Sequence, residues 1–129
     1  MKKVCFILIL QLLFIAWSCA DQVDPLTSEI YGEWQLTETL ADPGDGSGTW
    51  QPAVNAQFIV FKRDGTFIDS ANPKAKSTFL IIKKDTSMQI TTNGNELNYQ
   101  YRIQDVELIL RPTCFEACGN KYKKVMENP

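Results

Sequence analysis

The stretch that decides the fold is ELNYQYRI, residues 96–103. Its side chains alternate strictly, so that large apolar and aromatic residues occupy one face and polar residues the other. A period of two residues is typical of a half-buried β-strand, because successive side chains of a strand point to opposite faces of the sheet. The first face consists of Leu97, Tyr99, Tyr101 and Ile103.

Turn residues bound this strand on both sides and predict two hairpins. Asn93-Gly94-Asn95 precedes it, and Asn and Gly tolerate the positive φ angles of tight turns. Gln104-Asp105 follows it and leads into VELILRP, residues 106–112, which alternates again. The strands on either side of residues 96–103 are therefore expected to be its antiparallel neighbours.

The same pattern of short segments and turns continues outward over the chain. A first alternating strand is predicted at 30–40, with Ile30, Gly32, Trp34, Leu36 and Leu40 on one face, and a Gly- and Pro-rich loop at 41–52. Hairpins are predicted at 56–70 and 78–92, and a last strand at 121–126. Eight short strands joined mostly by hairpins predict an all-β domain, an eight-stranded antiparallel up-and-down barrel, because closure removes the exposed sheet edges.

The first eighteen residues differ from the rest of the chain. Two lysines precede VCFILILQLLFIAW, residues 4–17, an apolar run interrupted only by Gln11. The run is shorter than the roughly 20 residues of a membrane-spanning helix, and it ends near small residues. Residues 1–18 are therefore predicted to be a secretory signal peptide, with a retained membrane helix as the alternative.

The end of this segment, Ala16-Trp17-Ser18-Cys19, resembles the lipobox of bacterial lipoproteins, although Trp17 departs from the usual pattern. The resemblance implies cleavage before Cys19 and lipid on its thiol. The polar composition of residues 20–29 predicts a flexible tether, which spans 19–29 with the cysteine and precedes a domain over 30–129. Ordinary secretory cleavage with a free Cys19 thiol is the alternative. Because residues 1–18 contain two lysines and no acidic residue, their removal changes the formal net charge from −2 to −4.

Short motifs are also spread over residues 30–127. They are Gly32-x-Trp34-x-Leu36, Asp64-Gly65-Thr66-Phe67, Tyr101-x-Ile103, Leu108-x-Leu110 and the late pair Cys114 and Cys118. Together they look like the lipocalin-like domains of small bacterial lipoproteins, especially those of the Bacteroidetes type. The resemblance implies a barrel of a ligand-binding kind, held on the bacterial envelope by lipid. The outer membrane, on its periplasmic or its surface side, is the expected location.

Cys114 and Cys118 are predicted to form a disulfide. Export brings the chain into an oxidising compartment, where disulfides persist, and the C-x-x-x-C spacing before Gly119 allows a small closed loop. A metal or redox pair is the alternative. Two thiols without histidine make a poor zinc site, and the redox spacing C-x-x-C is missing.

The composition argues against several classes of function. The chain has no histidine, which removes Ser/His and Cys/His catalytic arrangements and the commonest metal ligand. The formal net charge of −2 leaves no basic field for a nucleic acid. We therefore expect neither an enzyme nor a metal or cofactor site, and the partners expected are the membrane, a small apolar ligand or an envelope protein.

Aromatic residues are the candidate ligand contacts, although packing in the core is the favoured interpretation for most of them. Trp50, in the Gly-rich loop, is expected either to contact a ligand or to cover the barrel opening. The candidates are Trp34, Trp50, Phe58, Phe67, Phe79, Tyr99 and Tyr101. Two functions remain open: binding a small apolar ligand or acting as an accessory protein, and binding another protein with a filled barrel. An apolar cavity of about 300 Å³ or more would favour the first.

Overall fold

The computed structural model describes residues 30–126, and the regular elements in this range are all β-strands. They are β1 (Gly32–Ala41), β2 (Trp50–Pro52), β3 (Phe58–Phe61), β4 (Thr66–Asp69), β5 (Ser77–Lys83), β6 (Ser87–Thr92), β7 (Asn95–Gln104), β8 (Glu107–Pro112) and β9 (Cys118–Met126). Within the described range, no helix is long and apolar enough to cross a membrane. The predicted signal peptide, Cys19 and the tether lie outside the described residues.

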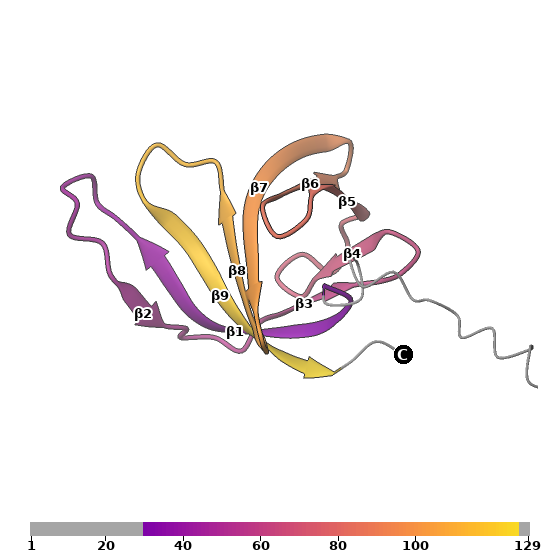
Figure 1. Cartoon of the computed structure of the whole chain (residues 1–129), viewed down its shortest axis with the longest axis horizontal. Helices are drawn as coiled ribbons and strands as arrows, with labels where there is room; N and C mark the ends of the chain where they lie inside the picture. The colour runs from indigo at the N-terminus through magenta and orange to yellow at the C-terminus, as the bar shows by residue number, and fades with distance from the viewer. Residues whose placement is uncertain (1–29, 127–129) are drawn as a thin grey trace, which may run out of the picture.

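Eight of the strands close into an antiparallel barrel. Strands β3 to β9 pair in chain order, and β1 pairs with β3 on one edge and β9 on the other. Figure 1 shows this ring, with β2 beside β1 at its margin. The predicted all-β, eight-stranded up-and-down barrel is therefore confirmed. The turn between β6 and β7 uses positive φ angles at Asn93 and Gly94, 50° and 84°, as its sequence predicts.

The ninth strand, β2, lies where the sequence predicts an irregular loop. Trp50 pairs with Leu40 and Pro52 pairs with Glu38, while the Ala53 amide donates to the Thr37 carbonyl over 2.9 Å. The pairing is possible because β3 occupies only the first part of this edge of β1. Pro52 has no amide hydrogen, so the outer edge of β2 is a poor template for further strands.

A β-bulge in β1 changes which of its side chains face the interior. The register with β9 passes from the pair Leu36–Tyr122 to the pair Glu38–Lys121, so that β1 contains one extra residue. Leu40 therefore shares the outer face with Glu38. The strict alternation predicts Leu40 on the face of Leu36, and that prediction is wrong because an unpaired residue shifts the phase.

The barrel interior is filled at the end where β1 begins, which we call the base. The largest fully buried side chains are Trp34, Phe61, Met88 and Leu108, which come from four different strands. The Trp34 indole donates to the Ile30 carbonyl over 2.8 Å, which holds the segment before β1 against the base. The ring of Phe61 packs against Phe67 and Phe79, with centroids 5.1 and 4.9 Å apart. This end of the barrel is therefore a closed, aromatic core.

Candidate functional site

The opposite end of the barrel, where β1 ends, carries the longer connections, and we call it the rim. The antiparallel order places three loops there: residues 42–49 after β1, 70–76 after β4 and 113–117 after β8. Figure 1 shows the first and the last of these extending from the same end. Loops fixed on a rigid scaffold are the usual location of binding residues, so the rim is the candidate functional site.

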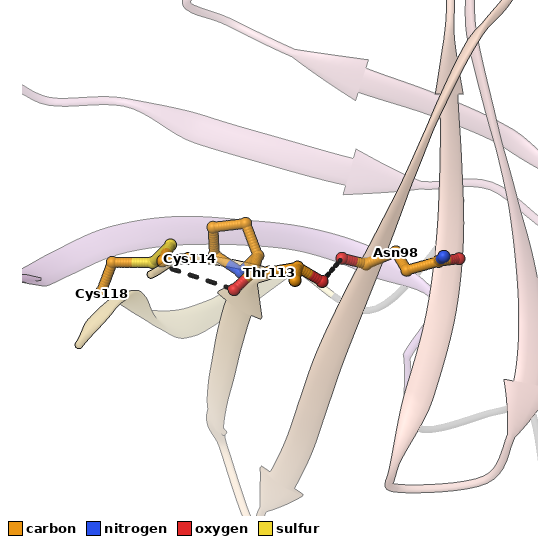
Figure 2. The surroundings of a disulfide bond; sticks show 5 residues. Asn98, Thr113, Cys114 and Cys118 are labelled. Atoms are coloured by element: carbon orange, nitrogen blue, oxygen red, sulfur yellow. Dashed lines mark hydrogen bonds between the residues drawn. A yellow bond between two sulfur atoms is a disulfide. The ribbon is translucent and has the colours of Figure 1, made fainter. Parts of the chain in front are cut away.

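A disulfide constrains the loop between β8 and β9. Cys114 and Cys118 are bonded, as their spacing predicts, with their Cα atoms 6.3 Å apart. Figure 2 shows the loop also tied to β7, because the Thr113 hydroxyl donates to the Asn98 carbonyl over 3.3 Å. The Cys118 sulfur lies 3.8 Å from the carbonyl oxygen of Pro112. The loop is thus fixed at both of its ends.

Replacement of both Cys114 and Cys118 by alanine is expected to lower the free energy of unfolding by about 2 kcal/mol, as the loop-closure entropy of so short a loop predicts. The full-length protein in a neutral detergent would be unfolded with urea, and the midpoint should fall while the slope stays constant. Treating the parent protein with a reductant should give the same shift. An unchanged midpoint in both would contradict a stabilising bridge.

The loop after β1 folds around the carboxylate of Asp42. Its Oδ1 accepts hydrogen bonds from the amides of Gly44 and Gly46, over 2.8 and 3.1 Å, and its Oδ2 from that of Gly48 over 3.0 Å. These bonds, that of Gly44 first, lower the pKa of Asp42. The Asp42 amide donates to the Ala117 carbonyl over 3.0 Å, which joins this loop to the disulfide loop. The sequence predicts only a Gly- and Pro-rich loop here, and the structure gives this loop a defined network of hydrogen bonds.

Trp50 lies against the outer face of the barrel, near two cations. The Lys121 Nζ is 4.5 Å and the Arg111 Cζ 5.8 Å from the centre of the ring. Gly119 makes this possible, because a Cβ there would stand 3.3 Å from Trp50 Cη2 and 2.9 Å from Arg111 Cγ. Lys121 also forms an ion pair with Glu38 over 2.7 Å. We call Trp50, Arg111 and Lys121 the tryptophan clamp.

A groove of about 240 Å³ lies between the tryptophan clamp and the disulfide loop. Arg111 contributes to its wall from β8, and Gln100 contributes from β7, where it pairs with Arg111. The remaining lining residues are Leu40, Pro112, Thr113, Cys114, Glu116, Ala117 and Cys118. Beside the groove, Phe115 in the disulfide loop is fully exposed. Cationic, polar and apolar contacts are therefore offered together on one side of the rim.

Inside the barrel, four polar side chains lie on the strands toward the rim. Asp69, Tyr99, Asn120 and Tyr122 each pair with a buried residue of the neighbouring strand, which places them on the inner face. Burial raises the pKa of Tyr122 to about 12 and that of Tyr99 in the same direction, with Asp69 contributing to both. The Asn120 amide donates to the Tyr122 hydroxyl over 3.3 Å. Burial therefore favours the neutral form of both phenols.

The seven predicted aromatic contacts do not form one site. Trp34, Phe67 and Tyr101 are buried in the core, and Phe79 and Tyr99 are half-buried inside the barrel. Phe58 pairs with Gln35, lies on the outer face and is 40% exposed. Trp50 neither lines the interior nor covers the opening.

Arg111 and Gly119 are the rim residues that sequence reasoning missed. Lys121 begins the predicted last strand, and the structure places it in the tryptophan clamp. A glycine inside a strand often marks a close approach of another group, and this was the available signal for Gly119.

Comparison of the chain with models of protein families, with curated proteins and with solved structures finds no match. The function is therefore inferred from the molecule itself. Within residues 30–126, no group of three or more His, Cys, Asp or Glu side chains could hold a metal ion.

Proposed function

We propose that this protein is a lipid-anchored accessory protein of the bacterial cell envelope that binds another envelope protein through the rim of its barrel. The observation that carries this proposal is that the rim is fixed in place and yet exposed. A disulfide, the Asp42 hydrogen bonds and the tryptophan clamp hold its loops, while Phe115 and the groove remain accessible. Ordered, exposed aromatic and apolar side chains favour a protein-binding surface.

The filled base supports binding at the rim over binding a small apolar ligand inside. Trp34, Phe61, Met88 and Leu108 have no appreciable exposure and approach the barrel axis from different sides. An eight-stranded barrel has an interior only just wide enough for such side chains. The polar groups of Asp69, Tyr99 and Tyr122 on the inner face toward the rim are also unfavourable contacts for an apolar ligand.

The lipid anchor belongs to the same proposal and rests on the sequence. With lipid on Cys19, residues 20–29 would form a tether whose average reach is roughly 15–20 Å if flexible. Such a tether would keep the barrel near the membrane surface, which suits an accessory role beside a membrane-bound partner. The outer membrane is the proposed site. Fatty-acid labelling of the parent chain and a Cys19→Ser variant tests the anchor.

A photo-crosslinking amino acid placed at Phe115 tests the rim as an interface. In intact cells of the source organism, position 115 is expected to give one discrete larger adduct after irradiation, because the side chain would lie against the partner. Val106 is a matched control, since it is an exposed apolar residue in the turn between β7 and β8 at the base.

The control distinguishes a specific interface from random collision. Position 106 should give no adduct of the same mass, and the adduct at position 115 should disappear when the cells are solubilised and diluted before irradiation. Equal adducts from both positions, or none from position 115, would contradict binding at the rim.

A further inference from the structure

We propose that the groove beside the tryptophan clamp binds a carboxylate side chain from an acidic segment of the partner protein, with Arg111 as its counter-ion. This inference rests on the proposed function and specifies the chemistry of the partner at the rim. Three features of the groove support it: the charges around Arg111, the packing of the Arg111 stem, and the carboxylate of Glu116.

Arg111 is the cation of the clamp that has no carboxylate partner among the described residues. Lys121 is already paired with Glu38, whose carboxylate lies 2.7 Å from its Nζ. Among the described residues, no carboxylate lies within ion-pairing distance of the Arg111 guanidinium, whose Cζ lies 5.8 Å from the centre of the Trp50 ring. An arginine beside a groove and without a protein carboxylate is available for a bidentate bond with an external one.

The clamp restricts the stem of the Arg111 side chain before any partner binds. The Trp50 ring packs over Gly119, and the space that a Cβ would fill is occupied by Arg111 Cγ and Trp50 Cη2. A side chain whose stem is already packed loses less conformational entropy on binding. Trp and Arg are also the residue types most enriched among the energetic centres of protein interfaces.

A carboxylate in the lining of the groove limits the charge of the ligand. Glu116 lines the groove together with Arg111, and its carboxylate would repel a second negative charge on the ligand. A phosphate dianion would therefore meet one free cation and one anion, whereas a carboxylate carries a single charge that Arg111 can match. The Gln100 amide, across from Arg111 on β7, adds a neutral hydrogen-bonding group for the same oxygen atoms.

The outer face around the groove favours the approach of an acidic segment. Exposed Arg102 on β7 and Lys123 on β9 lie on the same face as Arg111 and Lys121. Glu107 opposes Lys123, and Glu38 pairs with Lys121, so these carboxylates offset part of the charge. The attraction of Arg111 and Arg102 for an acidic segment would act mainly on the rate of association and would weaken as salt is added. Phe115 in the neighbouring loop would contact apolar residues that flank the acidic one.

Titration with an acidic peptide tests the groove. The full-length protein in a neutral detergent would be titrated with an acetylated, amidated hexapeptide of alternating glutamate and glycine, and with its glutamine counterpart. The indole N–H signal of Trp50, assigned with a Trp50→Phe variant, and the Nε–H signal of Arg111 are the nuclear magnetic resonance readouts. Both should shift with the glutamate peptide and stay constant with the glutamine peptide.

Three variants with different expected effects on the affinity for the peptide make the test specific. Arg111→Gln should weaken binding about tenfold, because the counter-ion is lost. Glu116→Gln should tighten binding about two- to threefold, because a screened repulsion is removed. Arg102→Gln, an exposed arginine outside the groove, should change binding less than about twofold.

The outcomes separate the groove chemistry from the proposed function. Equal weakening by Arg111→Gln and Arg102→Gln, or inorganic phosphate shifting both signals as strongly as the glutamate peptide, would overturn the inference. In cells, an adduct from position 115 that persists unchanged in Arg111→Gln would overturn the inference and leave rim binding standing. Peptide binding without any adduct from position 115 would support the groove chemistry and contradict the proposed function.

Discussion

Trp34→Ala is expected to lower the free energy of unfolding by about 3–5 kcal/mol, the largest loss that we expect from any single substitution in the barrel. The Trp34 side chain has no exposed surface, and its removal would leave a cavity that the closed β-sheet cannot collapse to fill. The substitution also removes the indole bond to the Ile30 carbonyl and the ring beside Lys124, whose Nζ lies 5.2 Å from its centre. Urea unfolding, followed by circular dichroism, measures the loss.

Two further variants show which part of the effect comes from packing. Trp34→Phe keeps most of the buried volume and removes the hydrogen bond to Ile30, so its cost should be about 1–2 kcal/mol. Trp50→Ala removes a half-buried ring from the outer face and should cost about 1 kcal/mol, mainly through the two cation–π contacts. If Trp34→Ala and Trp50→Ala cost the same, the view of Trp34 as the centre of a filled base would be wrong.

The barrel could be predicted because its strands and turns depend on residues that are close together in the sequence. The alternation at 96–103 specifies which face is buried, and the observed strand β7 spans these residues with Tyr101 buried. The residues Asn93, Gly94 and Asp105 adopt the positive φ angles that their types tolerate. Hairpins connect neighbours along the chain, so the order of strands follows from the order of segments.

The rim could not be predicted to the same depth because its structure depends on contacts between distant segments. The bulge that turns Leu40 outward arises from the register with β9, about eighty residues later in the chain. Trp50 can pack here because Gly119 lacks a side chain, and Arg111 and Lys121 lie near its ring. None of these relations leaves a periodic signal, so the sequence predicts only an irregular loop at 41–52.

The Asp42 loop has a defined network of hydrogen bonds, although its composition is typical of a flexible segment. A segment rich in Gly and Pro ordinarily indicates flexibility, since it contains few side chains that can pack. Here the glycines leave room around one carboxylate, and a Cβ at Gly48 would lie 2.7 Å from that of Asp42. The backbone amides of the loop can then donate hydrogen bonds to both carboxylate oxygens of Asp42. The small residues thus make an ordered loop possible.

Cys19→Ser is expected to abolish fatty-acid labelling and to release the protein from the membrane fraction. Several acyl chains on one cysteine hold a protein stably, whereas a single chain gives only marginal binding, so loss of the modified thiol removes the whole attachment. The measurement is radioactive fatty-acid incorporation, together with the distribution of the protein between membrane and soluble fractions after cell breakage. The lipobox resemblance of Ala16-Trp17-Ser18-Cys19 is the basis for this prediction.

Cys5→Ser is the matched control, because this cysteine lies within the predicted signal peptide and would be removed with it. It should label and fractionate like the parent chain. If the parent chain and Cys19→Ser both fractionate with membranes and neither carries label, the apolar run at 4–17 is retained as an anchor, and the alternative interpretation of the leader is right. If the parent chain carries no label and a free thiol at Cys19 reacts with maleimide, the lipoprotein proposal is wrong. Binding at the rim would then have to be explained for a protein that diffuses freely within its compartment.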